Sequence, residues 1–145
     1  MGTKRHLLVD GRGTPRALVV TGANRHDVTQ TEPVLDSIVV NRPKVTPEKP
    51  QHLCADKAYD SKEDREAMPQ RGYIPHVRSR GEERLEKCSD PGYRARRWVV
   101  EACHSRMNRF RKILVRYEKT DLSYLALVSL ACAIIAWRKA VASYG

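Results

Sequence analysis

The chain has 145 residues, 30% of them charged and 41% hydrophobic, a composition that predicts a globular domain with a core and excludes a disordered chain. Its formal net charge is +10, because 27 Lys and Arg residues outnumber 17 Asp and Glu. A chain this basic usually binds a polyanion, so we expect nucleic acid or an anionic membrane surface as its partner.

The cysteine pattern argues against a structural zinc site. Cys54, Cys88, Cys103 and Cys132 are widely scattered, and none belongs to a C-x-x-C pair. Cys54 and Cys132 stand in apolar runs, where we expect small buried hydrophobic residues. Residues 1–6 do not form the apolar region of a signal peptide, so a reducing cytoplasm is the expected location.

The amino-terminal part predicts a β-hairpin. Two apolar runs flank turn residues over positions 10–15, which predicts a hairpin over residues 5–21. A polar loop over residues 22–27 follows. Asp27 or Thr29 is then expected to cap a short helix.

The middle of the chain predicts two strands joined by a helix. After a Pro- and charge-rich loop over residues 41–51, a short apolar strand over residues 52–56 ends in Asp56. Ser61 is the expected N-cap of a helix that runs to about Gln70. A second strand over residues 73–77 follows, and it should pair with the first in parallel because a helix connects them.

The carboxy-terminal part predicts two long helices after a charged loop over residues 78–92. The first, over residues 94–117, carries an apolar stripe at helical spacing. The second, over residues 122–142, is apolar, but its uninterrupted run ends at Trp137 and is shorter than the roughly 20 residues of a membrane span. We therefore expect a buried helix there. The stripe of the first helix consists of Val99, Cys103, Met107, Phe110, Leu114 and Tyr117.

This order of elements predicts an α/β fold in which helices flank a mixed sheet, formed by residues 1–145 as a single domain. Two acids stand out in it. Asp56 is placed where a strand ends, and Glu101 lies about 200° around its helix from Val99, off the apolar stripe. Between Tyr93 and Lys119, nine Lys and Arg accompany only two acids. One interpretation is a solvent-exposed helix in which Arg97 and Glu101 form an ion pair. This interpretation accounts for the two residues but not for the excess of positive charge around them. Carboxylates in a cationic setting favour metal-dependent chemistry on a phosphate backbone.

Several segments, in this order and spacing, resemble the DDE transposases of bacterial insertion sequences, which have a ribonuclease-H-like fold. Asp56-Lys57-Ala58-Tyr59 is similar to the D-x-(G/A)-(Y/F) motif of the second aspartate, and Arg97 to Glu101 is similar to the R-x-x-x-E motif of the glutamate helix. The other similar segments are residues 4–10 with 13–15, residues 21–29 and residues 108–119.

The resemblance implies that Asp56 and Glu101 are the second and third acids of a catalytic triad that holds two Mg²⁺ or Mn²⁺ ions. It implies cleavage and strand transfer of transposon DNA ends, with transposon ends and target DNA as partners and no membrane. Whether the chain forms a homodimer stays open. The residues expected to contact DNA are Lys57, Arg94, Arg97, Asn108, Arg109 and Lys112.

The resemblance also implies a missing part. The first catalytic Asp of the family belongs on a strand upstream of the segment that Lys4–Asp10 resembles, so we expect a fold that is incomplete at the amino terminus. Without that central strand, the hairpin and the parallel pair would lack a shared neighbour. Asp10 and Asp27 are less favoured candidates for the first acid. After Glu101, the residues Ala102 to Met107 depart from the family pattern.

Three hypotheses therefore remain. The first is that the chain is a transposase catalytic segment that is active only if the missing strand is supplied, and inactive alone. The second is that it is a catalytically inactive DNA-binding remnant or regulator. The third, less favoured, is a membrane-surface protein that uses the basic face and the apolar helix.

Overall fold

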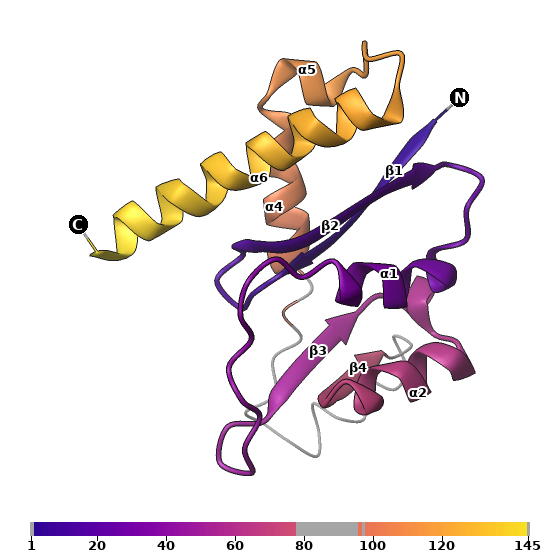
Figure 1. Ribbon diagram of the computed structural model, residues 1–145, viewed down its shortest axis with the longest axis vertical. Coiled ribbons are helices and arrows are strands. Elements are labelled where there is room, and N and C mark those ends of the chain that lie inside the picture. The colour runs from indigo at the N-terminus through magenta and orange to yellow at the C-terminus, as the bar shows by residue number, and fades with distance from the viewer. Residues whose placement is uncertain (1, 78–95, 97, 145) are drawn as a thin grey trace. The chain divides into compact units, whose positions relative to one another are not determined.

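The structure is a computed structural model that describes residues 2–77, 96 and 98–144. The chain divides into two compact units, and each is described by itself. Figure 1 colours the chain by residue number from the amino terminus to the carboxy terminus. The hairpin unit comprises residues 1–25, 33–39 and 98–145. The parallel-strand unit comprises residues 26–32 and 40–97.

The hairpin unit takes its name from β1 (Thr3–Val9) and β2 (Pro15–Gly22), which pair antiparallel with Leu7 opposite Leu18. The sequence predicted this hairpin over residues 5–21. The connecting turn contains Gly13 with φ of 76°, a left-handed conformation that costs glycine little. A register shift marks the end of β1, next to this turn.

The helices of this unit differ from the prediction of one helix over residues 94–117. The described residues instead form α4 (Trp98–Asn108) and α5 (Arg111–Leu114), separated where Phe110 adopts an extended backbone. The break changes the helical phase, so Ile113 is buried while Leu114 and Tyr117 are 61% and 74% exposed. The predicted stripe is therefore correct as far as Met107 and wrong for its last two members.

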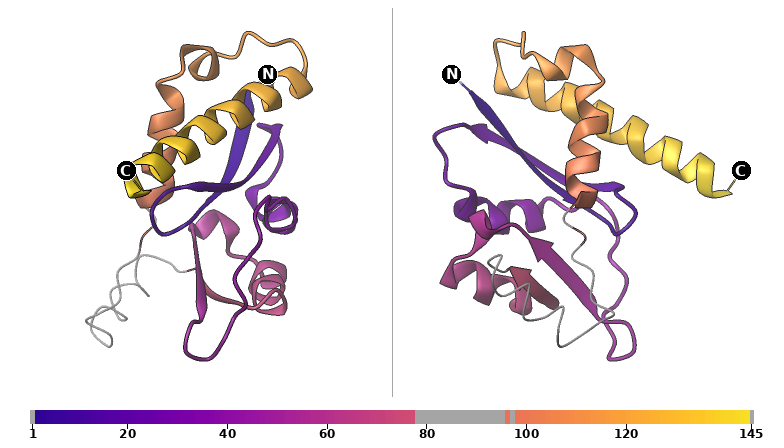
Figure 2. Two further views of the ribbon diagram at one scale, coloured as in Figure 1. Left: turned by 60° about the vertical axis from the view of Figure 1, so that its left-hand side comes forward. Right: turned by 180° about the vertical axis from the view of Figure 1, so that it is seen from behind.

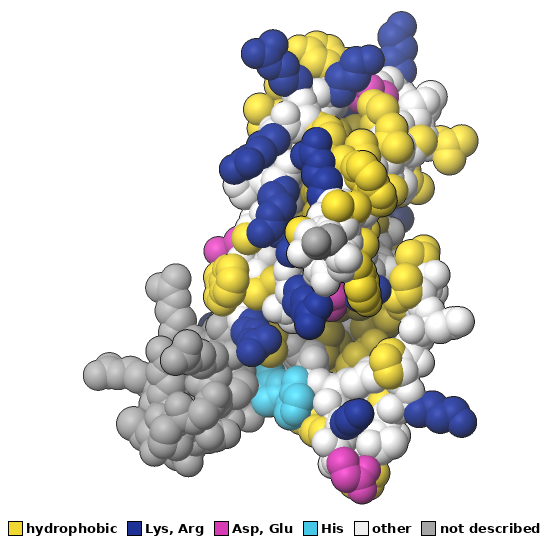
Figure 3. All heavy atoms as spheres, turned by 90° about the vertical axis from the view of Figure 1, so that its left-hand side faces the viewer, with side chains coloured by type: hydrophobic (Ala, Val, Ile, Leu, Met, Phe, Trp, Pro, Cys, Tyr) yellow, Lys and Arg dark blue, Asp and Glu magenta, His cyan; other side chains and the backbone are white. Residues whose placement is uncertain are grey.

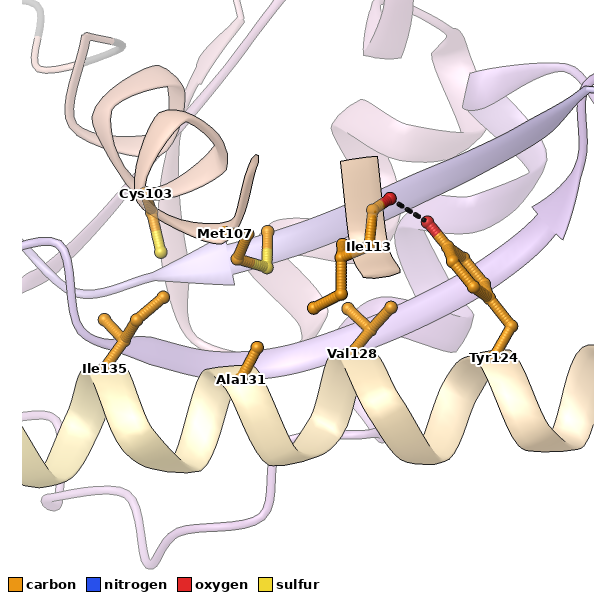
Figure 4. Packing of buried hydrophobic residues seen from close by; sticks show 7 residues of the cluster. All are labelled: Cys103, Met107, Ile113, Tyr124, Val128, Ala131 and Ile135. Atoms are coloured by element: carbon orange, nitrogen blue, oxygen red, sulfur yellow. Dashed lines mark hydrogen bonds between the residues drawn. The ribbon is translucent and has the colours of Figure 1, made fainter. Parts of the chain in front are cut away.

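Helix α6 (Asp121–Tyr144) follows, close to the expected bounds of 122–142. Helices α4 and α6 both pack against the hairpin, α4 on β1 and α6 on β2 (Figure 2). Figure 4 shows the core that results, with side chains from α4 and α5 meeting one side of α6. The hydroxyl of Tyr124 donates to the carbonyl oxygen of Ile113 at 3.4 Å. The core consists of Cys103, Met107, Ile113, Tyr124, Val128, Ala131 and Ile135.

The parallel-strand unit is built on β3 (Gln51–Ala55) and β4 (Tyr73–Val77), which pair in parallel with Leu53 opposite Pro75. Between them lie the single-turn η2 (Lys57–Tyr59) and α2 (Lys62–Gln70). The hydroxyl oxygen of Ser61 accepts from the backbone N–H of Asp64 at 3.0 Å, which makes Ser61 the N-cap as expected. The buried hydrophobic residues of the unit are Leu53, Ala67, Met68 and Val77.

Two local expectations were wrong in this part of the chain. Cys54 is exposed, because Leu53 takes the covered face of β3 and adjacent strand residues point to opposite faces. The turn η1 (Asp27–Gln30), which precedes α1 (Thr31–Asp36), begins after His26 without a side-chain capping bond, so neither Asp27 nor Thr29 is the cap.

The described residues therefore form a mixed α/β structure with two small sheets, β1–β2 and β3–β4. The single mixed sheet that the sequence predicted is not formed among them, because no described strand pairs with both β1 and β3.

Candidate active site

Asp56 follows directly on the last residue of β3 and is exposed. Burial of Leu53 anchors the strand, and Asp56 keeps an extended backbone with φ of −75° and ψ of 162°. Its Oδ1 accepts from the backbone N–H of Lys57 at 2.6 Å, so the carboxylate caps η2. The strand end and the cap together fix the direction of this carboxylate.

Other carboxylates surround the same turn. Burial, together with the negative charges of Asp27, Asp56 and Asp64, raises the pKa of Tyr59 to about 12. Asp27 reaches this turn because η1 and η2 contact each other, although they are about 30 residues apart in the chain, whereas Asp64 lies on the following helix α2. Three carboxylates therefore act on the turn at the end of β3.

Asp64 is the buried member of this group. Its side chain is only 2% exposed, and its Oδ2 has no hydrogen-bond partner among the described residues. Neither Asp64 nor Tyr59 was predicted as a site residue: Tyr59 was only the last residue of the Asp56 motif, and Asp64 lies in the first turn of the helix that Ser61 caps.

Glu101 belongs to the hairpin unit and lies on the exposed side of α4. The opposite side of that helix carries Val99, Cys103 and Met107, which are 4%, 0% and 0% exposed. Packing of this side on the core sets the rotation of α4 and directs Glu101 outward. Asp56 and Glu101 thus belong to different units, each with a defined local setting.

The predicted DNA contacts fall into three groups. Lys57, Arg109 and Lys112 are exposed on described elements. The amide oxygen of Asn108 instead accepts from Nη2 of Arg5 at 2.8 Å. Arg94 and Arg97 lie outside the described residues. Figure 3 shows Lys and Arg side chains spread among hydrophobic ones over one face of the molecule.

Asp10 is engaged in the hairpin turn. Its Oδ1 accepts from the backbone N–H groups of Arg12 and Thr14, both at 2.9 Å, and its Oδ2 accepts from Arg16 at 2.7 Å. Burial raises the pKa of Asp10, but these hydrogen bonds and the charge of Arg16 more than offset it and hold the pKa below 3.8. The arrangement makes Asp10 a turn residue.

A second group of polar residues lies where α4 packs on β1 and was not predicted. His6 of β1 is 2% exposed, and its Nε2 is 2.9 Å from the hydroxyl of Thr21. Burial lowers the pKa of His104 on α4, and the charges of Arg5 and His6 also lower it. The group therefore belongs to the packing of α4 on the hairpin.

Residues 2–77, 96 and 98–144 contain no group of three or more His, Cys, Asp or Glu side chains placed to hold a metal ion. They do contain one helix, α6, that is long and apolar enough to cross a membrane by length and composition, although core helices of soluble proteins meet the same criteria.

Comparison with known proteins identifies the class. Residues 1–136 match the family model described as the transposase DDE domain, so the chain belongs to this family. It is 38% identical over 138 residues to a protein of Burkholderia cepacia named as a transposase for the insertion sequence element IS402; the match covers 94% of this chain and 63% of that protein. It is also 27% identical over 148 residues to a Brucella ovis protein named as a transposase for the element IS6501, with 93% and 98% covered. No solved structure matches the chain.

Proposed function

We propose that this chain carries the second and third carboxylates, Asp56 and Glu101, of a DDE transposase active site that cleaves transposon DNA ends and transfers them to target DNA. The observation that carries the proposal is the setting of Asp56, exposed at the end of β3 and near the carboxylates of Asp27 and Asp64, in a chain that matches the DDE domain over residues 1–136.

The donor set suits a hard divalent cation. Carboxylate oxygens are the ligands that Mg²⁺ and Mn²⁺ prefer, and both proposed ligands are carboxylates rather than thiols or imidazoles. When bound, two such ions would activate water or a 3′-hydroxyl and stabilise the leaving oxygen of the DNA strand. In this proposal Asp56 and Glu101 hold the ions, while Tyr59 stays neutral over the working pH range and adds no charge.

Basic residues would hold the DNA. We propose that Lys57, Arg109 and Lys112 bind backbone phosphates, with Arg94 and Arg97 in the same role. Lys57 lies beside Asp56 in sequence, so it would place a phosphate next to that carboxylate. The chain would act in the bacterial cytoplasm, at the nucleoid, where its DNA partners are.

The triad needs one more Asp. The carboxylate of Asp10 is already bound to its own turn and to Arg16, which argues against it. The chain spans 63% of the length of the IS402 relative. We therefore propose that the first Asp comes from a segment like the part of such a relative that the match does not cover, on a strand that pairs with both sheets, as in a ribonuclease-H-like fold.

The test is Mn²⁺- or Mg²⁺-dependent cleavage of DNA that carries the ends of the element. The chain is assayed alone and joined to the part of the IS402 relative that the match does not cover. Asp56→Asn and Glu101→Gln should each lower the cleavage rate more than about 100-fold, beyond the effect of losing an outer-shell partner of a metal. Glu63→Gln, an exposed acid on α2, is the matched control and should leave the rate unchanged.

Cleavage that survives Asp56→Asn would refute the assignment. Salt-sensitive DNA binding without cleavage in the joined protein would instead favour an inactive DNA-binding remnant.

A further inference from the structure

Helix α6 has two apolar faces, and the described residues cover only one of them. Its inner face packs into the core of the hairpin unit. Its outer face is exposed: Leu122 is 77%, Leu130 58% and Trp137 67% exposed. The outer stripe repeats every three or four residues along the whole helix and consists of Leu122, Ala126, Leu130, Ala133, Trp137, Val141 and Tyr144.

The outer face carries no charge. At about 100° per residue, the centre of the outer stripe lies roughly 170° from the buried stripe. The charged residues of α6, Asp121, Arg138 and Lys139, lie about 120–140° from that centre, beside the inner face. A helix with its outer face in water normally shows the reverse pattern. In a chain that is 30% charged, an uncharged exposed stripe of this length indicates an interface.

The outer stripe is also nearly symmetric about Ala133. Leu122 and Tyr144 each lie 11 residues from Ala133, and Leu130 and Trp137 lie three and four residues from it. A twofold contact brings each patch against itself, so an antiparallel pair of α6 helices would place large residues opposite large ones at both ends. Ala133 would meet its own copy at the crossing, where a small side chain allows close approach of the helices.

The size of the stripe suits a second copy. Helix α6 has 24 residues and is therefore about 36 Å long. Trp137 and Tyr144 are 67% and 94% exposed, so these two side chains alone offer roughly 250–400 Å² per copy. Adding the aliphatic members brings the total for two copies to the order of 1,000 Å², which a stable interface requires.

We propose that α6 is a dimerisation helix, which pairs antiparallel with α6 of a second copy of this chain through the outer stripe, about a twofold axis near Ala133. The inner face is held by the protein core, with Tyr124 bonded to the carbonyl of Ile113, so lipid cannot surround the helix. The inference stands apart from the proposed cleavage chemistry, because no residue of the stripe belongs to the candidate active site.

Cysteine cross-linking tests the register. In the full chain with Cys54→Ser and Cys88→Ser, Ala133→Cys should form a disulfide-linked dimer under mild oxidation. Leu122→Cys alone should not, whereas a mixture of Leu122→Cys with Tyr144→Cys should cross-link between the two variants. The parent chain, which keeps Cys103 and the half-buried Cys132, is the background control.

Sedimentation at high salt, on protein freed of nucleic acid, tests the association itself. Leu130→Glu should raise the dimer dissociation constant at least about 30-fold. Ser143→Glu, an exposed change off the stripe, should leave it unchanged. Circular dichroism confirms that both variants are folded.

A protein that stays monomeric at all concentrations would overturn the proposal, and so would self-cross-linking at Leu122→Cys. Binding of the outer stripe to vesicles of anionic lipid, seen in a flotation assay, would also overturn it.

Discussion

The two units of this chain differ in how much protein supports their carboxylates. The hairpin unit buries a seven-residue core between three helices and backs it with β1 and β2. Among the described residues of the parallel-strand unit, β3 pairs with β4, one short helix, α2, packs on β4, and Cys54 and Ile74 are exposed. Glu101 therefore lies on a firmly packed helix, while Asp56 lies at the end of a strand that the described residues cover only in part. The comparison teaches that the local stability of a candidate catalytic group is set by the unit that carries it.

A matched pair of methionines tests this comparison most strongly. Met107 of the hairpin unit and Met68 of the parallel-strand unit are 0% and 1% exposed. Truncation of either to Ala should lower the free energy of unfolding of its own unit by about 2–5 kcal/mol. Hydrogen exchange followed by mass spectrometry reports each unit separately. Loss of protection across both units from either change would show that they unfold as one body.

The hairpin turn gives a smaller effect with a defined pH dependence. Asp10→Asn should lower the free energy of unfolding by about 1 kcal/mol at pH 7, because the pair with Arg16 is lost. The folded-state pKa of Asp10 lies below 3.8, so its contribution is present above pH 3.8 and is lost as the pH falls through the lower folded value.

Urea unfolding at pH 7 and at pH 2.5 measures this effect. The difference between wild type and Asp10→Asn should shrink at the lower pH. Glu63→Gln should give no difference at either pH, and an Asp10→Asn effect that is equal at both would contradict the role of its charge.

The smallest expected effect is on a titration. The pKa of Tyr59 is about 12, above its ordinary value of 10.0, so the contribution to stability is complete below pH 10 and is lost as the pH rises toward 12. Asp56→Asn removes one of the negative charges that raise this pKa and should lower it. Nuclear magnetic resonance of tyrosines with labelled ring carbons measures the change. An unchanged pKa of Tyr59 would show that the charge of Asp56 does not act on it.

Much of the local structure was predictable from the sequence. Glycine and proline between two apolar runs predicted the hairpin, and a helix between residues 52–56 and 73–77 predicted parallel pairing. The break at Phe110 was not predictable, because residues 109–117 have ordinary helix propensity and the packing of Ile113 decides it. The exposure of Cys54 was missed because both Leu53 and Cys54 are apolar, so periodicity alone could not assign their faces.

The candidate site was likewise predictable only in part. The position of Asp56 followed from the end of a strand, and that of Glu101 from its distance around the helix from Val99. The surroundings of Asp56 were not predictable, because Asp27 reaches Tyr59 through contacts between η1 and η2 that leave no local pattern in the sequence.

One measurement tests most directly the proposal that Asp56 and Glu101 both hold catalytic metal ions. Fe²⁺ replaces Mg²⁺ in carboxylate sites and, with ascorbate and peroxide, cuts the backbone next to its ligands. In the protein joined to the uncovered part of the IS402 relative and bound to DNA, we predict cuts near both residues, suppression of both by excess Mg²⁺, and loss of the cut near Asp56 in Asp56→Asn. A cut near only one of the two acids, or a cut near Asp56 that survives Asp56→Asn, would contradict the proposal.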